Sequence, residues 1–142
     1  MEIVVNWLQR LLATLFISAV LTARGGYCDS AQPLSPEYEA CIARANGVTA
    51  EMLRCSNDEL ERQTLRLSRA MRLIMDSPRI STERKQEIAS GEKEWEAGRD
   101  KNCFATAQHE AGGGSLASMI ARDCAVSKTA DHAAELEAIA RE

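Results

Sequence analysis

Two cysteines stand almost symmetrically about a run of three glycines. Cys103 lies ten residues before Gly113, and Cys124 lies eleven residues after it. Glycine ends helices, so the run predicts a turn between two antiparallel helices. At ~1.5 Å per residue, each cysteine lies ~15 Å from that turn along its own helix. The spacing therefore predicts a Cys103–Cys124 disulfide that joins the two helices.

Residues 1–26 have the three-part layout of a secretory signal peptide. A first segment ends at the basic residue Arg10, residues 11–21 carry no charge, and small residues follow. Eleven residues at ~1.5 Å each are too few to cross a hydrocarbon core of ~30 Å, which argues against a membrane span. We expect cleavage near Gly25 or Gly26 and a periplasmic or secreted protein, in a compartment where disulfides form.

Five cysteines are left after the expected cleavage, and in an exported chain they predict a disulfide framework: Cys28, Cys41, Cys55, Cys103 and Cys124. Four of them can pair in three ways. With Cys103 joined to Cys124, the second predicted bridge is Cys41–Cys55, which would staple the leader to the first long helix. Each bridge would close a loop of roughly 14 to 22 residues and add about 3 kcal/mol. A small helical core needs such help.

Cys28 is the odd cysteine: it lies near the new N-terminus or is removed with the signal peptide, and if it is kept it is free or cross-linked to another chain. Lipid attachment favours a small residue before the cysteine, and Tyr27 is not small, which argues against a lipid on Cys28. We expect the protein to be attached to a membrane only if Cys28 carries such a lipid. The sequence has no CxxC, and His109 and His132 are not grouped with cysteine pairs. We therefore predict no metal site and no cofactor.

The first part of the exported chain is predicted to be a leader followed by a helix. Residues 27–40 contain two of the three prolines and are predicted to be extended. A helix is expected from Thr49, as its N-cap, with Glu51 in its first turn and its end before Pro78. Its apolar stripe recurs every seven residues, at Leu53, Leu60, Leu67 and Ile74.

Two more helices are expected. One begins at Ser81 or Thr82, carries Trp95 on its apolar side and ends at the glycine run. The other begins near Ser115, and its C-terminal end is less apolar, so we expect that end to be only partly docked. The predicted fold is all-α: a small antiparallel three-helix bundle stapled by two disulfides, over residues 41–142.

The sequence offers little for catalysis. It lacks a nucleophile elbow, an HExxH motif, a Cys/His nucleophile motif and a phosphate loop. His109 and Glu110 could do acid–base work, but no nucleophile or second carboxylate is placed near them. We predict no enzyme activity. Instead, His109, Glu110 and Ser115 flank the glycine turn and could enter a partner's cleft.

The most specific polar cluster follows Trp95. Arg99 and Asp100 could form a binding site. We favour a structural role, in which Trp95 belongs to the core and Arg99 pairs with a carboxylate on the first long helix, such as Glu59.

The exported chain is acidic. The whole sequence has a net charge of −4, and removing residues 1–26 takes away Glu2, Arg10 and Arg24, which makes the remainder one unit more negative. An acidic protein is a poor ligand for nucleic acid, so we predict none. It is better suited to a basic protein partner.

Three segments resemble the LprI-like family, which is named for a lysozyme inhibitor. They are VTAEMLRC at 48–55, EWEAGRDKNC at 94–103 and GGSLASMIARDC at 113–124. The matching positions are Cys41, Thr49, Glu51, Met52, Cys55, Trp95, Arg99, Asp100, Cys103, Gly113, Gly114, Ser115, Met119 and Cys124. Departures are Met71 and Gly98, where the family has aromatic residues, and Lys128 and His132 in the last helix. These departures predict a looser core and a weakly docked C-terminal end.

The resemblance implies an exported, disulfide-bonded helical domain whose matched residues are scaffold. It also implies lysozyme inhibition. We expect an envelope binding protein that occludes the cleft of a basic, lysozyme-type muramidase with the loop around His109–Ser115. The alternatives are an immunity or adaptor protein for another secreted toxin or envelope component, and a small envelope hydrolase.

Overall fold

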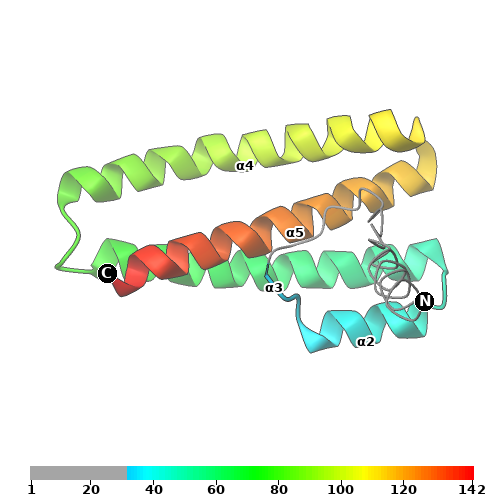
Figure 1. Cartoon of the computed structure of the whole chain (residues 1–142), viewed down its shortest axis with the longest axis horizontal. Helices are drawn as coiled ribbons and strands as arrows, with labels where there is room; N and C mark the ends of the chain where they lie inside the picture. The colour runs from blue at the N-terminus through cyan, green and yellow to red at the C-terminus, as the bar shows by residue number, and fades with distance from the viewer. Residues whose placement is uncertain (1–31) are drawn as a thin grey trace, which may run out of the picture.

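The computed structural model describes residues 32–142, which form four α-helices and no strand. In chain order these are α2 (Pro36–Ala45), α3 (Thr49–Asp76), α4 (Thr82–Ala111) and α5 (Gly114–Arg141). Each helix runs antiparallel to the one before it, and α2 is the short one (Figure 1). Within residues 32–142, no helix is long and apolar enough to cross a membrane. The all-α prediction is confirmed. The predicted signal peptide and Cys28 lie outside the described residues.

The prediction of three helices is wrong because the leader is not extended throughout. α2 begins inside the predicted leader at Pro36, is capped by Ser35 and continues to Ala45. The Ser35 hydroxyl accepts a hydrogen bond from the Tyr38 N–H at 3.1 Å. Proline fits the first helical position, since the missing N–H would have no partner there. The two prolines of residues 27–40 favour an extended leader in the sequence, but Pro36 starts a helix.

The α3 helix has the predicted length, and its predicted apolar stripe is buried at Leu67 and Ile74 only. Its capping position is Val48, and Thr49, the predicted N-cap, is the first helical residue. Leu53 and Leu60 are only partly buried. Three of the seven buried residues of α3 are polar: Ser56, Glu59 and Gln63, beside Cys55, Leu67, Ala70 and Ile74.

The C-terminal half of α5 is firmly packed against α3, contrary to the prediction of partial docking. Leu67, Ala70 and Ile74 form a core cluster with Ala133 and Leu136. Alanine is only weakly apolar, so the apolar pattern of the sequence underestimates how tightly this end packs. Its small side chain lets two helices approach closely. Next to this cluster, two nitrogens of Arg66 donate to the Glu137 carboxylate at 2.6 and 2.8 Å.

The α4 helix is the most exposed of the long helices. Of its 30 residues, only Cys103 and Ala107 are buried. The Ser81 hydroxyl caps its start by accepting from the Arg84 N–H at 3.2 Å, and Gly112 caps its end. Gly112, Gly113 and Gly114 all have positive φ, of 66°, 132° and 75°. Such backbone favours glycine, and it produces the predicted turn.

Both disulfides pair as predicted. Cys103 on α4 and Cys124 on α5 are joined with a Cα–Cα distance of 5.5 Å. Cys41 on α2 and Cys55 on α3 are joined with a Cα–Cα distance of 5.7 Å. One bridge therefore closes the α4–α5 hairpin, and the other closes the α2–α3 hairpin.

Candidate functional site

The tip of the α4–α5 hairpin carries the residues predicted to bind a partner. His109 and Glu110 lie in the last turn of α4, Ser115 lies in the first turn of α5, and all three are exposed. Leu116, which is 50% exposed, adds an apolar side chain beside them. The tip lies at the same end of the molecule as the α2–α3 turn (Figure 1). Because His109 and Glu110 are both exposed, they suit surface contact better than acid–base catalysis, which needs two side chains that are positioned and shielded from water.

An open groove of about 490 Å³ runs between α4 and α5 behind this tip. Phe104, which is 61% exposed, stands at one wall, and Arg99 and Arg122 supply positive charge. The groove is also lined by Asp100, Cys103, Gln108, Ala117, Ser118, Ala121 and Ala125. The Cys103–Cys124 disulfide fixes the spacing of the two helices here. The hairpin therefore presents a polar tip, two exposed apolar side chains and a groove whose charged lining is Arg99, Asp100 and Arg122.

The predicted Arg99–Glu59 pair is not formed. Arg99 instead donates to Asp100 Oδ1 at 2.8 Å and to the Thr129 hydroxyl of α5 at 3.1 Å. Its guanidinium lies 5.3 Å from the ring centre of Trp95. The prediction is wrong because Arg99 faces α5, whereas Glu59 faces α2. Arg99 nevertheless has a packing role, since its side chain is only 10% exposed.

Trp95 packs against the core cluster, as predicted, and stacks on His132 of α5. The two ring centres are 4.0 Å apart, with 22° between the ring planes. The His132 Nε2 lies 2.8 Å from a Glu92 oxygen, and its Nδ1 lies 3.1 Å from a Glu135 oxygen. His132 was expected to weaken the docking of α5, but it is one of the contacts that join α4 to α5.

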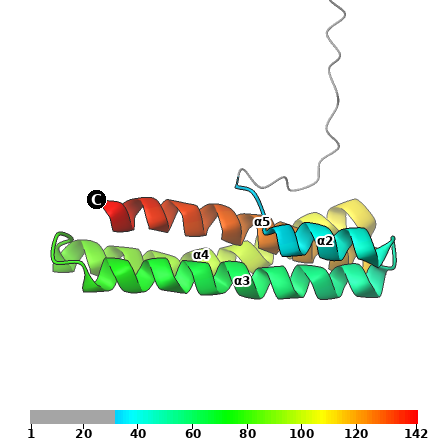
Figure 2. The ribbon, with the colours of Figure 1, turned by 90° about the horizontal axis from the view of Figure 1, so that it is seen from below.

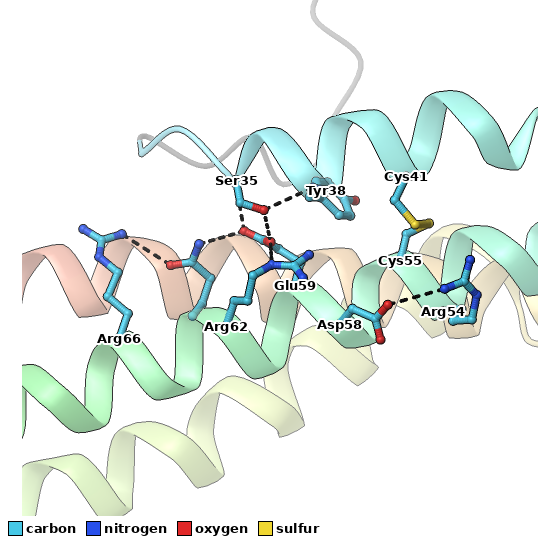
Figure 3. A network of polar contacts seen from close by, with 10 residues as sticks. Ser35, Tyr38, Cys41, Arg54, Cys55, Asp58, Glu59, Arg62 and Arg66 are labelled. Carbon is cyan, nitrogen blue, oxygen red and sulfur yellow. Dashed lines mark hydrogen bonds and ion pairs between the residues drawn. A yellow bond between two sulfur atoms is a disulfide. The ribbon is translucent and has the colours of Figure 1, made fainter.

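A buried carboxylate holds α2 on α3. Glu59 is 0% exposed. Figure 3 shows its carboxylate between Ser35 of α2 and neighbours on α3. The Ser35 N–H donates at 3.0 Å and the Ser35 hydroxyl at 2.5 Å, and Gln63 and Arg62 each donate at 2.7 Å. Burial raises the pKa of Glu59, but these hydrogen bonds outweigh it, and the pKa lies below its ordinary value.

A second acidic group sits where α2, α3 and α5 meet. Asp123 of α5 accepts from the Ser56 hydroxyl at 2.6 Å and from the Tyr38 hydroxyl at 3.4 Å. Burial raises the pKa of Asp123 above its ordinary value, and these two hydrogen bonds do not outweigh it. The three helices are therefore joined by a polar contact as well as by packing.

The sequence predicted Glu59 only as a partner of Arg99 and did not predict the contacts of Glu59 with Ser35 or those of Asp123. The available signal was the row Ser56, Glu59 and Gln63, which continues at helical spacing into the apolar row of α3. Polar residues on the buried side of a helix indicate an internal hydrogen-bond network. Both networks serve as scaffold. Within residues 32–142, no group of three His, Cys, Asp or Glu side chains is placed to hold a metal ion.

These features define a disulfide-stapled helical domain with a protruding hairpin. The chain matches the family described as lysozyme inhibitor LprI over residues 41–136, from the first disulfide cysteine to late α5. It belongs to that family. No curated protein and no solved structure matches the chain.

Proposed function

We propose that this is an exported envelope protein that inhibits a lysozyme-type muramidase by inserting the tip of its α4–α5 hairpin into the enzyme's cleft. The observation that carries the proposal is the tip itself, where His109, Glu110, Ser115 and Leu116 are all exposed. The Cys103–Cys124 bridge holds α4 and α5 together below the tip, which lowers the entropy lost on binding. Family membership and the acidic charge support this reading, because a negative domain attracts a basic enzyme.

The location and the absence of catalysis belong to the same proposal. Two disulfides support an oxidising compartment, the periplasm or the exterior. Occlusion requires no catalytic residue on the inhibitor, since a glycosidase cleft is blocked once its two carboxylates are covered.

The proposal is tested by titrating the purified, oxidised protein against c-type, g-type and bacterial muramidases on cell-wall substrate. The test variant combines His109→Ala, Glu110→Ala and Ser115→Ala. Its control combines Arg84→Ala and Glu87→Ala, an exposed pair near the other end of α4. We expect dose-dependent inhibition that the tip variant loses and the control keeps. Full inhibition by the tip variant would show that the inhibitory site lies elsewhere on the protein.

A reduced sample tests the role of the scaffold. Reduction should abolish inhibition, because the hairpin then loses its clamp. If no muramidase is inhibited, the proposal fails, and a tight partner captured from envelope extract would favour the immunity or adaptor function instead. Turnover of an envelope substrate that depends on His109 or Glu110 would favour the hydrolase.

A further inference from the structure

The α2–α3 turn lies at the same height as the hairpin tip. Figure 1 and Figure 2 both show the two turns at one end of the bundle, where α3 and α5 begin and run in the same direction. The two helices are joined by the Ser56 hydroxyl, which donates to Asp123 at 2.6 Å. Val48 lies eight residues before Ser56. Leu116 lies seven residues before Asp123. At ~1.5 Å per residue, Val48 and Leu116 therefore lie ~12 Å and ~10.5 Å beyond that contact, at nearly equal height.

Each turn presents an exposed apolar side chain on a defined backbone. Val48 is 54% exposed and Leu116 is 50% exposed. The α2–α3 turn is closed by the Val48 N–H, which donates to the Ala45 carbonyl at 2.9 Å. The Cys41–Cys55 bridge joins α2 to α3 below this turn, as the other bridge joins α4 to α5 below the tip. We call the exposed residues of both turns the two-turn surface: Asn46, Gly47, Val48, His109, Glu110, Ser115 and Leu116.

The hairpin tip alone is too small for a tight interface. It comprises eight residues, 109–116. A stable interface of standard size takes roughly 20–30 residues from each partner. A protein that accepts the tip must therefore contact further residues around it. The α2–α3 turn meets this need, because it lies at the same end of the bundle and at the same height.

We propose that the α2–α3 turn is a second contact with the same partner: while the hairpin tip enters the muramidase cleft, Val48 packs against an apolar patch on the rim of that cleft. This inference rests on the proposed function and adds a second binding segment to it. The charged residues nearest to Val48 in the chain, Arg44 and Glu51, have opposite signs. The turn therefore contributes an apolar contact, and the attraction of a basic enzyme comes from the acidic chain as a whole.

The test is Val48→Ser, measured as inhibition of the muramidase that the unmodified protein inhibits. Val48 occupies the N-cap position of α3, where serine is better than valine, so the variant should fold at least as well. Loss of a valine side chain that is buried in the complex should weaken inhibition roughly tenfold. The matched control is Leu65→Ser, which changes a side chain that is 58% exposed and lies 17 residues further along α3. It should inhibit as the unmodified protein does.

Photocrosslinking gives a second measurement that does not depend on inhibition strength. Two further variants, Val48→benzoylphenylalanine and Leu65→benzoylphenylalanine, are mixed with the enzyme and irradiated. We expect a crosslink to the enzyme from position 48 and none from position 65, because only the α2–α3 turn would lie against the rim of the cleft.

The outcomes separate this inference from the proposed function. Full inhibition by Val48→Ser, or no crosslink from position 48, would overturn this inference alone, provided that the tip variant loses inhibition. Equal weakening by Leu65→Ser would also overturn it, because loss of any exposed apolar side chain would then have the same effect. If no muramidase is inhibited by the unmodified protein, the proposed function fails and this inference fails with it.

Discussion

The hydroxyl of Ser35 joins two structures at once: it caps α2 by accepting from the Tyr38 N–H at 3.1 Å and donates to the buried Glu59 carboxylate at 2.5 Å. Ser35 therefore both caps the N-terminus of α2 and attaches it to α3. The Cys41–Cys55 bridge holds the same helix further along its length. Two independent contacts thus position a short helix that could not be stable alone.

Removing the Glu59 carboxylate should destabilise the protein strongly. Glu59→Ala leaves the Ser35 N–H and the Gln63 amide without an acceptor, and we expect a loss of about 3 kcal/mol in the free energy of unfolding. Urea unfolding measures it. The control is Asp58→Ala, which removes an exposed carboxylate 3.6 Å from Arg54 and should cost about 0.5 kcal/mol or less. Equal losses in the two variants would contradict the role given to Glu59.

Glu59 and Asp123 should give opposite pH dependences. The pKa of Glu59 is lowered in the folded state, so its contribution is present above the unfolded pKa and is lost as the pH falls through the folded pKa. The pKa of Asp123 is raised, so the folded state holds more protons between the two values, and stability falls as the pH rises through that window.

The measurement is urea unfolding from about pH 3 to pH 7, the range in which carboxyl groups titrate. Relative to the unmodified protein, Asp123→Asn should gain stability as the pH rises, and Glu59→Gln should lose it. Parallel pH profiles for the two variants would show that the assigned shifts are wrong.

The glycines of α4 and of the turn should respond oppositely to alanine. A Cβ added at Gly98 meets no atom within 4 Å, and the residue lies inside a helix. Gly98→Ala should therefore stabilise the protein by about 0.5–1 kcal/mol. Gly113→Ala places a side chain at a φ of +132° and should cost about 1–2 kcal/mol. Thermal unfolding distinguishes the two signs, and a destabilised Gly98→Ala variant would refute the first.

The two disulfides should differ in what they protect. Replacing Cys103 and Cys124 with alanine should cost about 3 kcal/mol and should raise amide exchange along α4, which buries only Cys103 and Ala107. Replacing Cys41 and Cys55 with alanine should raise amide exchange in α2 by less than the first variant raises it in α4, because the hydrogen bonds of Glu59 to Ser35 still hold the start of α2. Hydrogen exchange followed by mass spectrometry makes the comparison. Exchange in α4 that is unaffected by loss of Cys103–Cys124 would contradict it.

Local signals in the sequence were sufficient for much of the scaffold. Pro78 ends α3, Ser81 starts α4 and the glycine run ends it, because caps and breakers act on neighbouring backbone. The Cys103–Cys124 bridge followed from helix geometry alone. At the hairpin tip, the sequence identified residues that the structure leaves exposed, but their binding role stays a prediction.

Tertiary structure decided which side chains are buried and what they contact. The sequence does not show that Glu59 is buried, since a buried carboxylate is stable only where donors converge on it, and Ser35, which supplies two of them, is 24 residues away in the chain. Nor does it show that Arg99 bonds to Thr129 or that α5 packs firmly through Ala133 and Leu136. Helix ends depend on residues a few positions apart, whereas burial depends on partners that are distant in the chain, and only the folded arrangement brings those together.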